Sequence, residues 1–138
     1  MRLLVGLAVV LLTSRQPEPV HITVRVLRVR ATAGGLLHVA LHREPGEGFP
    51  GRSSFANQAV RPLGQDVVVT FEAPPGRYAV AVHHDANSNG RMDSNFLGIP
   101  REGYAVSNDV RPKFRAPRFG EAEVHVTRDT TLVVHMNY

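Results

Sequence analysis

The 138-residue chain has no cysteine, so we expect neither disulfide bonds nor a lipid anchor attached through cysteine. Its stability must then come from core packing, with or without a bound metal. Lysine is almost missing as well: Lys113 is the only one, and the net charge of +4 rests on arginines scattered along the chain. Because nucleic-acid surfaces normally show a clustered basic stripe with stacking aromatics, we expect no nucleic-acid binding. The short basic patch at 111–115 is interpreted as a solvated loop face, with an anionic envelope polymer as the alternative partner.

Motifs of nucleophilic catalysis are also missing. The sequence has no Gly-x-Ser-x-Gly elbow and no phosphate-cradling glycine loop. A carboxylate pair for glycoside hydrolysis could be drawn from Asp85, Asp93 and Glu102, so a small hydrolase or carbohydrate-processing enzyme is one alternative. The same side chains are better explained as cation ligands, and we therefore expect a non-enzymatic protein.

No apolar run is long enough to cross a bilayer as a helix. Met1 and Arg2 precede an apolar stretch at 3–12, which is typical of a secretory signal peptide. We expect a signal peptide at 1–15, a single domain at 20–138, and export to the periplasm or the extracellular space, with no transmembrane segment in the mature chain. A buried N-terminal strand is the alternative, because no A-x-A cleavage site follows the apolar stretch.

Apolar and polar residues alternate in several short runs, as half-buried strands require. The runs lie at 20–29, 37–41, 67–71, 78–82, 122–126 and 132–136, and turn signals stand at Gly34-Gly35 and Pro74-Pro75-Gly76. No period is visible at 52–63, and the segment from Asp93 to Gly120 is predicted as one long polar loop. About six or seven strands without a useful helix predict an all-β fold, a single antiparallel β-sandwich with one long ordered loop.

The run from Asp85 to Asp93 matches the first half of a calcium-binding loop. Short oxygen-bearing side chains occupy alternate positions, and Gly90 follows the third of them, where the backbone must turn tightly. The second half fails, because Phe96 stands where an EF-hand places its bidentate glutamate. The predicted ligands of a weak calcium site, with a dissociation constant of about 10⁻⁴ to 10⁻³ M, are Asp85, Asn87, Asn89, the backbone carbonyl of Arg91, Asp93 and, as the missing acidic ligand, Glu102.

Two other interpretations of this region stay open. Asp85, Asn87 and Asn89 could form Asx-turns with their own backbone and need no metal. The pair His83-His84 could instead bind zinc or copper. Adjacent residues on a strand point to opposite faces, so such a site would need a histidine from a neighbouring strand, chosen from His38, His42, His125 and His135. His84 follows an inward-facing position, and a hydrogen-bonded core histidine is its more ordinary role.

Several further segments carry a resemblance to a known protein family. They are Pro75-Gly76-Arg77-Tyr78-Ala79-Val80, His84 to Gly90 with Asp93, Leu97 to Tyr104, Ser107-Asn108 and Ala116-Pro117-Arg118-Phe119. In this order they resemble the uncharacterised exported bacterial family called domain of unknown function 2141, although Ala105 stands where that family usually has glycine. The resemblance implies a transthyretin-like or immunoglobulin-like β-sandwich and an exported location, and it implies no reaction. We therefore expect a binding or structural module whose partner is an unidentified protein or envelope polymer.

Overall fold

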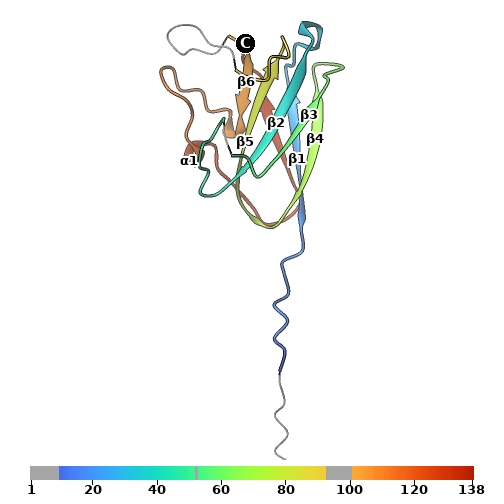
Figure 1. Cartoon of the computed structure of the whole chain (residues 1–138), viewed down its shortest axis with the longest axis vertical. Helices are drawn as coiled ribbons and strands as arrows, with labels where there is room; N and C mark the ends of the chain where they lie inside the picture. The colour runs from blue at the N-terminus through green and yellow to red at the C-terminus, as the bar shows by residue number, and fades with distance from the viewer. Residues whose placement is uncertain (1–9, 52, 93–100) are drawn as a thin grey trace, which may run out of the picture.

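The computed structural model describes residues 10–51, 53–92 and 101–138 (Figure 1). Within these residues the chain forms eight strands, two short 3₁₀ turns and one four-residue helix. The strands are β1 (Val20–Leu27), β2 (Leu36–Arg43), β3 (Ala56–Val60), β4 (Val67–Ala73), β5 (Gly76–Asp85), β6 (Gly103–Val106), β7 (Val124–Val126) and β8 (Thr130–His135). The turns are η1 (Ala31–Ala33) and η2 (Ser107–Asp109), and the helix is α1 (Phe119–Ala122).

The strands form two sheets that pack face to face (Figure 1). One sheet has the order β4-β1-β8, and the other has the order β3-β2-β5-β6, with β7 pairing beside the start of β5. All pairings are antiparallel except that of β1 with β8, which is parallel. The predicted all-β sandwich is therefore confirmed, with one parallel pair added to it.

The main core lies between the sheets and follows from the alternation in the sequence. On β1, Ile22, Val24 and Val26 are fully buried, while the residues between them face outward. The opposite sheet contributes the inward residues of β2 and β5, among them Leu41 and Val80, which are also fully buried. Burial of each such side chain stabilises the fold by about 1.5–3 kcal/mol.

Part of the outer face of the five-stranded sheet is covered by apolar side chains from Phe49 and the helix α1. Ala79 and Ala81 on β5 are small and buried, so Phe49 and the helix α1 can lie directly on the sheet. This second cluster explains why β5 is buried on both faces in its middle, from Tyr78 to Val82. Toward the end of β5 the apolar cover gives way to titratable side chains on the same outer face, beginning with His83.

Two strands were not predicted from the sequence. β3 lies in the segment that showed no period, because its burial is only partial and its residues are mixed in character. β6 lies inside the segment predicted as one long loop, and its four residues include Gly103, so no alternating pattern is visible there. The predicted run at 122–126 is shorter as a strand, because Ala122 ends α1 and β7 begins at Val124. The part of the predicted loop at 93–100 lies outside the described residues.

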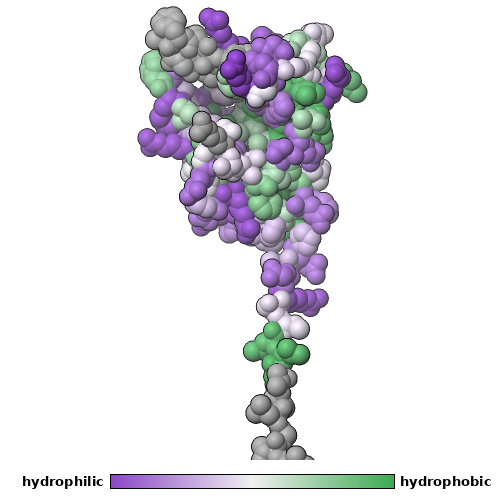
Figure 2. Space-filling view, viewed as in Figure 1, coloured by the Kyte–Doolittle hydropathy of each residue, from purple (hydrophilic) through white to green (hydrophobic). Residues whose placement is uncertain are grey.

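Residues 10–19 contain no strand or helix and extend away from the sandwich (Figure 1). Val10, Leu11 and Leu12 are exposed there and form a hydrophobic stretch set apart from the domain (Figure 2). The first nine residues lie outside the described part of the chain, so the signal peptide at 1–15 stays a prediction. Among the described residues, none of the helices has the length and apolar character needed to cross a membrane.

Candidate metal centre

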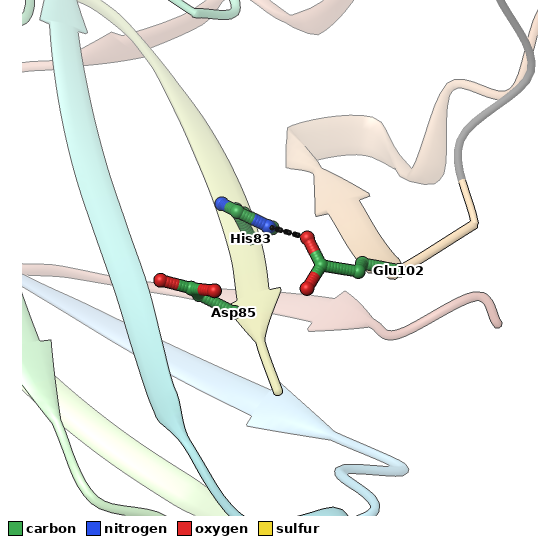
Figure 3. Close-up of side chains that lie close together, drawn as sticks. All are labelled: His83, Asp85 and Glu102. Carbon is green, nitrogen blue, oxygen red and sulfur yellow. Dashed lines mark hydrogen bonds and ion pairs between the residues drawn. The ribbon is translucent and has the colours of Figure 1, made fainter. Parts of the chain in front are cut away.

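Three titratable side chains meet at the end of β5, on the outer face of the five-stranded sheet (Figure 3). His83 and Asp85 share this face because they are two residues apart on one strand, and His84 between them points to the core. Gly103 of β6 pairs with His84, so Glu102, one residue earlier, arrives beside Asp85. The register of β5 and β6 therefore assembles the cluster.

The side chains of His83, Asp85 and Glu102 lie close enough to share one ion. Their ligand atoms all lie within 4.8 Å of one another, and His83 Nε2 is 2.7 Å from Glu102 Oε2. The three side chains are 20%, 2% and 8% exposed, respectively. Two carboxylates in so dry a place repel each other, and a positive charge between them relieves that repulsion.

His38 lies next to this cluster on β2. It stands directly opposite His83 in the antiparallel pairing, and the two imidazole rings stack with their centroids 5.9 Å apart. Its Nε2 is 3.7 Å from Asp85 Oδ2, which is beyond hydrogen-bonding distance but close enough for an electrostatic attraction. The outer face of β2 thus adds a second imidazole at the rim of the same site.

The Asp85 carboxylate is held by its own loop. Its Oδ1 accepts the backbone N–H of Asn89 at 3.0 Å, and its Oδ2 accepts that of Gly90 at 2.8 Å. Burial raises the pKa of Asp85, but these two N–H donors, with the charges of His83 and His38, outweigh it, so the pKa lies below its ordinary value. Asp85 is therefore ionised and oriented without any metal.

The rest of the loop shows the side-chain-to-backbone bonds of Asx-turns. Asn87 Oδ1 accepts the backbone N–H of Asn89 at 3.3 Å, and Asn89 Oδ1 accepts that of Arg91 at 3.0 Å. Gly90 has a φ of +77°, which glycine adopts at little cost. These contacts are the ones that metal-free Asx-turns require, and calcium binding by Asp85, Asn87, Asn89 and the carbonyl of Arg91 stays a prediction. The remaining predicted loop ligand, Asp93, lies outside the described residues.

His84 belongs to the core and not to the cluster. Its Nε2 is 2.8 Å from the carbonyl oxygen of Gly34, so that nitrogen must donate, and its Nδ1 is 2.8 Å from the hydroxyl of Tyr138. Both ring nitrogens are engaged and the residue is fully buried. The predicted alternative of a metal site through His83 and His84 together is therefore wrong for His84, as the alternation of a strand requires.

The sequence pattern of the family described as "Uncharacterized protein conserved in bacteria (DUF2141)" matches residues 24–133. The chain belongs to this family. The matched range runs from β1 into β8 and includes His38, His83, Asp85 and Glu102. No curated protein and no solved structure matched the chain. Because the family description names no activity, the function of this DUF2141 protein must be argued from its own site.

The other candidate histidines of the DUF2141 protein lie apart from the cluster. His42 is buried against the ring of Phe49, and burial lowers its pKa more than the nearby carbonyl of Pro50 raises it. His125 is exposed, and His135 contacts Asp109 at the end of β8. Of the four, only His38 therefore meets His83. The sequence indicated only that His38 occupies an outward position in the alternation of β2. The pairing of β2 with β5 was needed to select His38 from the four histidines.

Proposed function

We propose that this DUF2141 protein is an exported, non-enzymatic module that binds a divalent metal ion at the cluster of His83, Asp85 and Glu102. The observation that carries the proposal is the convergence of one imidazole nitrogen and two carboxylates within 4.8 Å, where β5 ends and the paired strand β6 is about to begin. These are common metal-binding groups, and the pairing of β5 with β6 brings them together before an ion arrives.

The charges of the cluster support this proposal. The pKa of Asp85 is lowered, so it is ionised, and Asp85 and Glu102 each lie beside a histidine. A divalent cation between two such carboxylates offsets their mutual repulsion. Each carboxylate oxygen has more than one lone pair, so Asp85 can keep its backbone bonds and still bind an ion.

Calcium is the ion predicted from the loop sequence, and a hydrolase using the same carboxylates is the competing function. Asp85 and Glu102 would serve either role, because each is a nearly buried carboxylate at the end of the sheet. The two functions differ in what they require of Glu102. Hydrolysis predicts that Glu102→Gln abolishes an activity while the metal affinity persists, whereas metal binding predicts that the affinity itself falls.

Thermal unfolding of the mature protein tests the proposal directly. The protein is unfolded with excess EDTA, then with millimolar calcium and, separately, with micromolar zinc. An ion that binds only the folded state stabilises it by RT ln(1 + [L]/Kd), which is about 2.7 kcal/mol at a hundred times Kd. We expect at least one ion to raise the melting temperature and Glu102→Gln to reduce that rise. No rise with either ion would overturn the proposal.

A further inference from the structure

A fourth side chain is aimed at the proposed centre. His38 Nε2 is buried and has no hydrogen-bond partner, although the side chain as a whole is 38% exposed. A buried ring nitrogen without a partner is costly, and a half-exposed imidazole could reach water through a different ring orientation. Instead, the nitrogen lies 3.7 Å from Asp85 Oδ2. A bound ion would supply the missing partner.

We propose that His38 is a metal ligand and that the ion is a late first-row transition metal of the zinc class, held by His38, His83, Asp85 and Glu102. This inference rests on the proposed function, because it names the ion and the fourth ligand of the same site. The sequence suggested a metal site through the neighbours His83 and His84. The proposed site instead uses His38 and His83, which stand opposite each other on the paired strands β2 and β5.

The donor set distinguishes the ion. Two imidazole nitrogens and two carboxylate oxygens suit zinc and its neighbours, whereas calcium takes six to eight ligands that are almost all oxygen. Calcium would leave both histidines unused, although they form half of the proposed ligand set. Imidazole therefore gives this site a selectivity that the loop sequence alone does not predict.

The spacing of the donors is also suitable. Ligand atoms bound tetrahedrally at about 2.0–2.1 Å from one zinc ion lie about 3.4 Å from each other. The contact of His83 with Glu102 is 2.7 Å and that of His38 with Asp85 is 3.7 Å, so the two distances bracket this value. His38 lies outside the group whose ligand atoms are all within 4.8 Å of one another, so its ring must turn toward His83 and Glu102 to complete the site.

Titration with cobalt(II) and zinc tests the inference in the mature protein. Tetrahedral cobalt(II) has strong visible absorption and octahedral cobalt(II) has weak absorption, so the spectrum reports the geometry and zinc competition reports the affinity. We expect a tetrahedral spectrum that zinc abolishes, and zinc affinity well above calcium affinity. His38→Gln should lower zinc affinity by at least about tenfold, since even partners outside the ligand shell cost that much.

The controls separate this inference from the function on which it rests. His21→Gln changes an exposed histidine that pairs with Asp129 on the other sheet, and it should leave the zinc affinity unchanged. Far-UV circular dichroism and unfolding in EDTA show whether His38→Gln is folded. Zinc binding that is unaffected by His38→Gln, or calcium binding tighter than zinc binding, overturns the inference and leaves the proposed function standing. If neither ion binds, both fail.

Discussion

Two histidine–carboxylate contacts of equal length lie in very different surroundings. His83 contacts Glu102 and His135 contacts Asp109, both at 2.7 Å. The first pair is 20% and 8% exposed and has a second carboxylate and a second imidazole beside it. The second pair is 32% and 38% exposed. Their comparison shows that the distance within a pair does not reveal its role.

The second pair has a structural explanation that the first lacks. Asp109 accepts both the backbone N–H and the ring nitrogen of His135, so one residue uses both of its oxygens. Arg111 donates to the carbonyl of His135, and Arg28 and Arg111 line a pocket of about 330 Å³ around the pair. Arg28 and Arg111 thus line the same pocket as a single carboxylate there, whereas two carboxylates and an imidazole converge within 4.8 Å in the first region. This convergence marks the candidate metal centre.

The largest expected difference between the two regions is the loss of folding stability when the aspartate of each region is replaced by alanine. Asp85→Ala leaves the backbone N–H groups of Asn89 and Gly90 without their acceptor, and we expect a loss of about 2–4 kcal/mol even in EDTA. Asp109→Ala removes exposed contacts and should cost about 1 kcal/mol. Urea unfolding of both variants measures the difference. Equal losses would show that the loop does not depend on Asp85.

Metal-dependent stabilisation should separate the pairs next. At zinc concentrations a hundred times Kd the wild-type protein should gain about 2.7 kcal/mol. Asp109→Asn should retain this gain, whereas Glu102→Gln should lose most of it, because only Glu102 lies in the cluster. Chemical unfolding with and without zinc provides the measurement. If the stabilisation by zinc disappeared in Asp109→Asn, the zinc site would have to lie in the pocket at the end of β8 and not at the cluster.

A substitution outside the cluster should act on it through β6. A Cβ at Gly103 would lie 2.3 Å from the ring of Tyr138, so in Gly103→Ala either this ring or the start of β6, next to Glu102, must shift. We expect a loss of about 1–3 kcal/mol from overpacking, together with weaker zinc binding. Gly120→Ala is the matched control, since a Cβ at that position would meet nothing within 4 Å. Normal zinc binding in a destabilised Gly103→Ala protein would show that Glu102 is not positioned by β6.

The smallest expected effect concerns a histidine that has no carboxylate partner. Burial lowers the pKa of His42, so its neutral form is favoured in the folded state. The unfolded chain then binds the proton first, and stability present above pH 6.5 is lost as the pH falls from 6.5 toward the folded pKa. His42→Phe should flatten this part of the stability profile, measured in EDTA. An unchanged profile would assign the dependence to other histidines.

The sequence predicted the fold where alternation was regular. β1, β2, β4, β5 and β8 were found because their buried residues recur at every second position, whereas β6 is too short and contains Gly103. Glu102 was predicted to return to the loop, and it lies beside Asp85 because β6 pairs with β5. That pairing joins segments about 20 residues apart, and no local pattern specifies it.

The choice of His38 shows the same limit. Its outward position on β2 could be predicted, but three other histidines were equally suitable until the register of β2 and β5 was known. The hydrogen bonds within the Asp85 loop, in contrast, follow from neighbouring residues, and Asx-turns were the alternative left open beside the predicted calcium site. Local chemistry was therefore readable, and contacts between distant segments were not.

The direction of β5 also determines where the cluster lies relative to the N-terminal segment. Val20, where the extended N-terminal segment joins the sandwich, pairs with Ala73 close to the start of β5, while Asp85 ends that strand. At about 3.3 Å per residue the two ends of β5 are about 30 Å apart. A protein immobilised through its N-terminal segment would consequently point the cluster away from the support, which makes this end the suitable attachment point for surface-based binding measurements.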